Sequence, residues 1–187
     1  YLSTAFKYSE TKFTDVSTTS ITSAPELAVI NSGGYNTGAL SYTLSYSTLD
    51  DNVLPREGIS ARFTQEYAGL GFDSNYLKTT AKASYFHMLS ESADVIGQLS
   101  GGGGHMMSTG SSNLRIFEHM FLGEETIRGF DTRGIGPRVF DSTGTTNIGA
   151  AGGTTYFNGS VEVSAPMPLV SRDFGLRFNA FADAATL

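Results

Sequence analysis

The chain has 187 residues, of which 16% are charged, and its formal net charge at pH 7 is −6. This acidic balance argues against nucleic-acid binding, because contact with phosphates requires a basic face. The chain contains no cysteine, which excludes disulfide bonds and thiolate chemistry. It also contains no run of about 18 apolar residues, so it does not cross a bilayer as a helix.

The 22 Gly, 13 Phe and 9 Tyr residues are typical of many strands joined by turns rather than of a helical bundle. Segments of roughly ten residues with alternating apolar and polar side chains recur along the chain. In chain order, the predicted strands are Tyr1–Glu10, Ala39–Leu49, Gly58–Gly69, Tyr76–Met88, Asp94–Gly103, Thr155–Met167 and Phe174–Ala185. The fold class is therefore all-β.

The length and pattern of these segments favour a transmembrane β-barrel over a soluble β-sandwich, whose strands also alternate. A tilted strand needs about nine to eleven residues to cross a bilayer, whereas soluble strands average about five or six. Tyrosines such as Tyr8, Tyr67 and Tyr85 lie towards strand ends, as an interfacial girdle requires. The apolar faces are predicted to carry no charge, and the opposite faces hold Lys7, Arg62, Glu66, Lys78, Lys82, Glu162, Arg177 and Asp183.

Single-chain bacterial barrels have an even number of strands, because lipid does not tolerate an unclosed sheet edge. Seven predicted strands cannot close such a barrel. We therefore expect residues 1–187 to be one partial outer-membrane β-barrel domain, a fragment of a larger antiparallel barrel.

The segment 104–153 separates the fifth and sixth predicted strands and is far longer than a hairpin loop. Connections of that length are usually functional. This one contains Ile127-Arg128-Gly129-Phe130, preceded by Phe121-Leu122-Gly123 and followed by Gly134-Ile135-Gly136-Pro137-Arg138.

These motifs resemble the loop signature of the BamA family of outer-membrane assembly factors. In that family, (Val/Ile)-Arg-Gly-Phe lies on a long loop that folds back into a sixteen-stranded barrel. Three further stretches agree with the family pattern: Tyr46–Gly58, Val161–Pro168 and Phe181–Ala184, with Ala184 or Ala185 standing where Gly is commoner. The resemblance covers most of Ala39–Leu187 and implies about seven of the sixteen strands.

The resemblance also implies a function. Family members insert and fold barrel proteins in the outer membrane of Gram-negative cells, without nucleotide or other cofactor. Their partners are unfolded outer-membrane protein precursors, the lipid bilayer and accessory lipoproteins that bind periplasmic repeats not contained in this sequence. The seam that opens to template incoming strands is also not contained in it. We expect no enzymatic activity.

The resemblance and the strand pattern together predict how the loop is held. A guanidinium carried into a barrel lumen must be paired, because a buried unpaired charge costs several kcal/mol. Because successive side chains of a strand alternate between its two faces, Glu162 and Asp183 fall on the polar side of adjacent strands. Arg128 is therefore predicted to dock between them. Gly129 should let the backbone approach the wall closely, with Phe130 packed beside it, and Gly134, Gly136 and Pro137 should shape the return path towards Arg138.

Other interpretations remain open at this point. Arg128 could be a solvated loop residue, and the two carboxylates could simply face water. The run Gly101–Gly104 fits either a flexible linker or a strand. Functionally, the alternatives are a two-partner secretion or translocation-and-assembly transporter, a passive pore and a lipase-type barrel enzyme. The chain shows no Ser-His motif for such an enzyme, and His87, His105 and His119 lack partners at metal-ligand spacing.

Overall fold

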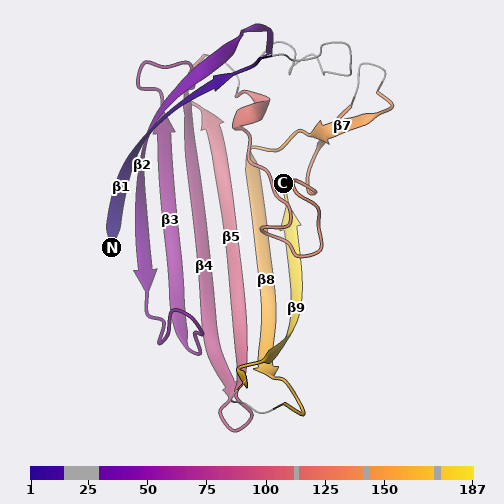
Figure 1. Ribbon diagram of the computed structural model, residues 1–187. Helices are drawn as coiled ribbons and strands as arrows, with labels where there is room; N and C mark the ends of the chain where they lie inside the picture. The colour runs from indigo at the N-terminus through magenta and orange to yellow at the C-terminus, as the bar shows by residue number, and fades with distance from the viewer. Residues whose placement is uncertain (15–29, 112–113, 141–143, 171–173) are drawn as a thin grey trace.

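The computed structural model describes residues 1–14, 30–111, 114–140, 144–170 and 174–187 (Figure 1). Seven strands form one antiparallel sheet in the order β1-β2-β3-β4-β5-β8-β9, so the sheet follows chain order. The strands are β1 (Leu2–Lys12), β2 (Gly34–Ser47), β3 (Gly58–Ala68), β4 (Tyr76–Ser90), β5 (Val95–Ser108), β8 (Thr155–Pro166) and β9 (Arg177–Thr186). The predicted all-β fold and its seven strands are confirmed.

The long connection from β5 to β8 has some regular structure of its own. It contains a short 3-10 helix, η1 (Ile116–Glu118), and a hairpin of β6 (Arg138–Phe140) and β7 (Asn147–Ala150). Figure 1 shows this segment lying near the ends of β8 and β9, close to the C-terminus. No helix in the described ranges is both long and apolar enough to cross a bilayer.

The predicted strand ends differ from the observed ones where pairing extends a strand. β2 begins at Gly34 rather than Ala39, because Lys12 to Tyr8 of β1 pair with it there. β5 continues to Ser108 rather than ending at Gly103, because it pairs with β4 on one side and β8 on the other. The run Gly101–Gly104 is therefore strand and not a linker, since two hydrogen-bonded neighbours overcome the weak strand preference of glycine.

The two faces of the sheet differ in polarity as the alternation predicted. Leu44, Phe63, Ala81, Gly103 and Phe157 are successive cross-strand partners and form one row of the apolar face. The large side chains of this face are mostly exposed, so the surroundings of the chain must cover it. The prediction that this face is free of charge is wrong at the end of β1. There Glu10 and Lys12 lie on this face and form an exposed ion pair, with Nζ and Oε1 2.8 Å apart.

The buried core lies on the opposite, polar face, where the β5–β8 connection folds over the sheet. It consists of Ala39, Ala68, Tyr76, Met106, Met120, Leu122 and Tyr156, of which Met120 and Leu122 come from the connection. Isolated bridges pair Met120 with Gly153 and Leu122 with Ile135. The connection is thus packed against the wall by apolar contacts as well as by its polar groups.

A charged cluster joins the turns at the other end of the sheet. The carboxylate of Asp94, between β4 and β5, accepts hydrogen bonds from Arg56 Nη1 and Arg177 Nη1, each at 2.7 Å. Arg177 Nη2 also donates to the backbone carbonyl of Asp94 at 2.7 Å. Because Arg56 precedes β3 and Arg177 begins β9, one carboxylate ties together three separate parts of this end of the sheet. We call these three residues the Asp94 cluster.

Gly58, the first residue of β3, occupies a position that a larger residue does not fit. Its φ is +113°, and a Cβ added there would lie 2.4 Å from the carbonyl oxygen of Thr48. We expect Gly58→Ala in the full-length protein to lower the free energy of unfolding by about 2 kcal/mol or more. Urea unfolding followed by heat-modifiable gel mobility measures this loss.

Gly159→Ala is the matched control for this substitution. Gly159 lies within β8, and its added Cβ would have no heavy atom nearer than 3.8 Å. It should leave the urea midpoint nearly unchanged. Equal midpoints for the two alanine variants would contradict the steric argument.

Candidate functional site

The candidate site is the tip of the β5–β8 connection, where a tight turn presents Arg128. The backbone N–H groups of Thr126 and Ile127 both donate to the carbonyl of Gly123 at 2.9 Å. Ile127 is buried, being 3% exposed, and Gly129 has a φ of +85°. The buried isoleucine and the left-handed glycine on either side of Arg128 fix the direction in which its side chain leaves the loop.

The guanidinium of Arg128 is bonded to β8 and β9 through all three of its nitrogens. Nε donates to Asp183 Oδ2 at 2.9 Å, and Nη2 donates to Asp183 Oδ1 at 2.7 Å, which makes a bidentate pair. Nη1 donates to a carboxylate oxygen of Glu162, and Nη2 donates to Ser160 Oγ at 2.9 Å. The backbone N–H of Arg128 also donates to Asp183 Oδ2 at 3.2 Å. The structure thus brings together Arg128, Glu162 and Asp183, the three residues predicted to meet.

The register of β8 and β9 builds the surface that receives this arginine. Ser160 pairs with Asp183, and Glu162 pairs with Phe181 two residue pairs further on, so all four side chains share the polar face. Ser160 Oγ donates to Asp183 Oδ1 at 2.6 Å, which orients the carboxylate. The ring of Phe181 lies under the guanidinium, with its centroid 3.5 Å from Cζ of Arg128. The guanidinium therefore has acids along its edges and an aromatic ring on its face.

The burial of these groups is graded. The side chain of Asp183 is 5% exposed, that of Glu162 20% and that of Arg128 40%. Hydrogen bonds from Arg128 to Asp183, and next to Glu162, raise the pKa of the guanidinium above its ordinary value. Arg128 therefore stays charged at any working pH, and the pair cannot be opened by deprotonating the arginine.

The other predicted loop residues have more varied roles. The backbone at Gly134 lies close to Asp131, since an added Cβ would be 2.6 Å from the carbonyl oxygen of Asp131. Gly136 has a φ of +105°, and its Cβ would meet the side chain of Leu187. The carbonyl of Pro137 accepts from Ala151 N at 2.9 Å, and Arg138 Nη2 donates to the carbonyl of Gly134 at 2.7 Å. These residues shape the return of the loop.

One expectation about the tip is wrong in detail. An added Cβ on Gly129 would meet no atom within 4 Å, so glycine is required there by the positive φ and not by close approach to the wall. Phe130 is half exposed, and its packing beside the wall stays a prediction. The ring that lies against the guanidinium belongs to Phe181. The sequence analysis did not predict that Phe181 and Ser160 contact Arg128. The signal for Phe181 was an aromatic residue with the same parity as Asp183, on the polar face.

A second arginine fixes the base of the same connection. Arg115 Nη1 donates to Glu118 Oε1 and to the carbonyl of Asp73, each at 3.2 Å. Its Cζ lies 4.8 Å from the ring centroid of Tyr35. The sequence analysis did not identify this contact, which depends on the ends of β2 and β4 meeting the loop. Among the described residues, no group of three or more His, Cys, Asp or Glu side chains could hold a metal ion.

Comparison with known proteins gives consistent matches. The Omp85 superfamily domain matches residues 1–187. The chain is 32% identical over 146 residues to the outer membrane protein assembly factor BamA of Neorickettsia risticii. This match covers 78% of this chain and 19% of that protein. It is 31% identical over 153 residues to a SAM50-like protein of Schizosaccharomyces pombe, covering 80% of this chain and 31% of the relative.

The fold also matches a solved structure. The crystal structure of BamA from Haemophilus ducreyi lacking POTRA domains 1–3 superimposes with a TM-score of 0.74 at 24% sequence identity. The match covers 82% of this chain and 30% of that one. The chain therefore spans between about a fifth and a third of the length of these relatives.

Proposed function

The chain belongs to the Omp85 superfamily, and we propose from this membership that it forms part of the barrel of a bacterial outer-membrane assembly factor. The observation that carries the proposal is the pairing of Arg128, within Ile-Arg-Gly-Phe, with Asp183 and Glu162 of the sheet. A relative that is 32% identical is named an outer membrane protein assembly factor, which supports the same role here.

In the proposed mechanism the loop is a structural part and not a catalytic one. Arg128 joins the loop tip to β8 and β9, and the apolar core holds the rest of the connection on the polar face. A loop held in this way stiffens that stretch of the wall and fills part of the lumen. Its contribution is to keep the barrel in the shape in which precursors are folded and inserted at another part of the wall.

The complete protein is proposed to form a sixteen-stranded barrel in the cell outer membrane. Its substrates are unfolded outer-membrane protein precursors, and accessory lipoproteins bind its periplasmic repeats. The proposal includes no enzymatic reaction and no cofactor. The related secretion transporters are a weaker candidate, because the named relatives are components of assembly machinery. A passive pore is also weaker, because the β5–β8 connection packs over the polar face.

Reconstitution tests this function directly. The full-length protein in liposomes should speed the folding of an urea-denatured barrel precursor relative to empty liposomes, as followed by heat-modifiable gel mobility. Planar-bilayer conductance measured on the same preparation should be low. A folded protein that leaves the precursor's folding rate unchanged and conducts ions steadily would instead support the passive pore.

A further inference from the structure

A row of polar side chains crosses the apolar face of the sheet. Tyr42, Gln65, Thr79, His105 and Thr155 are successive cross-strand partners from β2 to β8. Tyr42 Oη donates to Gln65 Oε1 at 3.0 Å, and Gln65 Nε2 donates to Thr79 Oγ1 at 3.1 Å. His105 Nδ1 and Thr155 Oγ1 are 2.7 Å apart. Hydrogen bonds along the row satisfy most of its polar atoms, as a surface that faces lipid requires.

The polar row lies one row inside the end of the apolar band, next to the row that carries Tyr67. On one side the next row is Leu40, Tyr67, Leu77 and Met107, and on the other side it is Leu44, Phe63, Ala81, Gly103 and Phe157. Polar side chains placed among lipid-facing residues are costly, and they usually have a functional reason.

Two neighbouring groups in this row remain available for a further hydrogen bond. Thr79 and His105 are direct cross-strand partners. Thr79 Oγ1 accepts from Gln65, and His105 uses Nδ1 towards Thr155. Within the described residues, neither the hydroxyl proton of Thr79 nor Nε2 of His105 forms a hydrogen bond. When Nδ1 accepts the proton of Thr155, Nε2 is a donor, so the two groups together suit an external oxygen acceptor.

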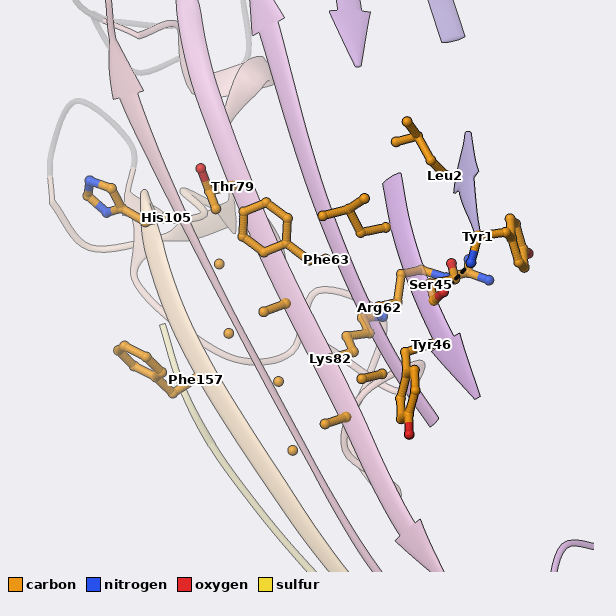
Figure 2. Close-up of a pocket in the computed structure, with 18 residues that line it drawn as sticks. Tyr1, Leu2, Ser45, Tyr46, Arg62, Phe63, Thr79, Lys82, His105 and Phe157 are labelled. Carbon is orange, nitrogen blue, oxygen red and sulfur yellow. Dashed lines mark hydrogen bonds between the residues drawn. The ribbon is translucent and has the colours of Figure 1, made fainter. Parts of the chain in front are cut away.

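These two groups stand at one end of an apolar groove. The groove has a volume of about 960 Å³, and Thr79 and His105 are among its lining residues. Figure 2 shows them at one end, with Phe63 and Phe157 beside the next part of the groove and Tyr46 further along. The floor between the two phenylalanines is formed by Ala81, Ala83, Gly101 and Gly103.

Crowding inside the chain accounts for one floor glycine and not for the other: a Cβ added to Gly103 would lie 3.0 Å from the ring of Phe157, whereas Gly101 has space around it. An added Cβ on Gly101 would have its nearest heavy atom 3.4 Å away, so the fold has room for a side chain there. Glycine within a strand weakens the strand and commonly marks a close approach by another molecule. The next row beyond the floor again has large side chains, namely the cross-strand partners Ile59, Tyr85, Leu99 and Val161.

We propose that this groove binds a glycerophospholipid of the surrounding membrane. One acyl chain lies over the small floor between Phe63 and Phe157, and an ester or phosphate oxygen accepts hydrogen bonds from Thr79 and His105. The inference rests on the membrane location in the proposed function, but not on the assembly activity. A lipid fits better than a polypeptide, because a peptide backbone carries a polar group at every residue, whereas the floor of Ala81, Ala83, Gly101 and Gly103 has no side-chain donor or acceptor.

Photoaffinity labelling tests the site in the full-length protein. The probe is phosphatidylethanolamine with a diazirine in one acyl chain, mixed into vesicles of phosphatidylethanolamine and phosphatidylglycerol, and adducts are mapped by peptide mass spectrometry. We expect adducts to concentrate on the peptides of β4, β5 and β8 that line the groove. Even labelling along the whole apolar face would overturn the proposal.

Two variants and one control sharpen the test. Ala83→Leu fills the floor and should reduce groove adducts by about fourfold or more. His105→Leu removes the polar anchor and should reduce them similarly. Ala180→Leu lies on the same face but pairs with Val163, outside the groove lining, and should change nothing. Unchanged groove adducts in both test variants, with wild-type gel mobility, would also overturn the proposal.

The outcome is separable from that of the proposed function. Even labelling by a protein that still speeds precursor folding would refute the lipid site alone. Concentrated labelling by a protein without folding activity would leave the lipid site standing and refute the assembly function.

Discussion

Arg128→Ala in the full-length protein is expected to lose the fast-migrating folded band at a lower temperature than the wild-type protein. The substitution removes four side-chain hydrogen bonds to Asp183, Glu162 and Ser160. It also leaves Asp183, whose side chain is 5% exposed, without its cation. Because the arginine itself is 40% exposed, solvent screens part of the effect. A loss of about 1–2 kcal/mol is expected.

The same variant should slow precursor folding in liposomes, because the loop tip is no longer held to the wall. Glu162→Gln combined with Asp183→Asn should reproduce both defects. Arg138→Ala is the comparison variant: within the described residues, the side chain of this loop arginine donates to the carbonyl of Gly134 and forms no ion pair, so its loss should cost less than that of Arg128. Wild-type gel mobility and activity in Arg128→Ala would rule out the structural role of the pair.

The second large effect is expected at the other end of the sheet, in the Asp94 cluster. Asp94→Asn removes the anion that Arg56 and Arg177 share, and it leaves two cations close together. Asparagine tolerates the φ of +53° found at this residue, so the backbone should be preserved. We expect a loss of about 1–3 kcal/mol, because the side chain of Arg177 is 13% exposed and depends on this partner.

Urea unfolding at low and high salt measures this contribution. The deficit of Asp94→Asn should shrink as salt rises, because the side chain of Arg56 is 44% exposed and its attraction to Asp94 is screened. Glu91→Gln removes an acid from the same turn and should cost little. If Glu91→Gln were as destabilising as Asp94→Asn, the effect would reflect net charge and not the cluster.

The sequence was sufficient to predict what depends on side-chain alternation. All seven strands, and the polar side on which Glu162 and Asp183 lie, follow from one rule, namely that a two-faced sheet needs alternate apolar residues. The ends of β2 and β5 could not be predicted in this way. They depend on how far the neighbouring strands pair, and this pairing carries β5 through four glycines to Ser108.

Within the site, the contacts between charged residues were predicted. The contacts that depend on which residues pair across neighbouring strands were missed. Arg128, Glu162 and Asp183 were predicted because a loop cation inside a lumen requires acids. Phe181 was missed because its contact depends on its pairing with Glu162, which places an aromatic ring on the same face as Asp183, two residues away along β9. The Asp94 cluster was missed for the same reason, since it joins residues up to 83 positions apart.

Within the described ranges, the long connection is attached to the seven-stranded sheet at two places. Its tip is held by β8 and β9, and its middle by the core from β2 to β8. The charged tip and the apolar core are separate contacts, so the loss of one of them would leave the connection held to the same sheet by the other.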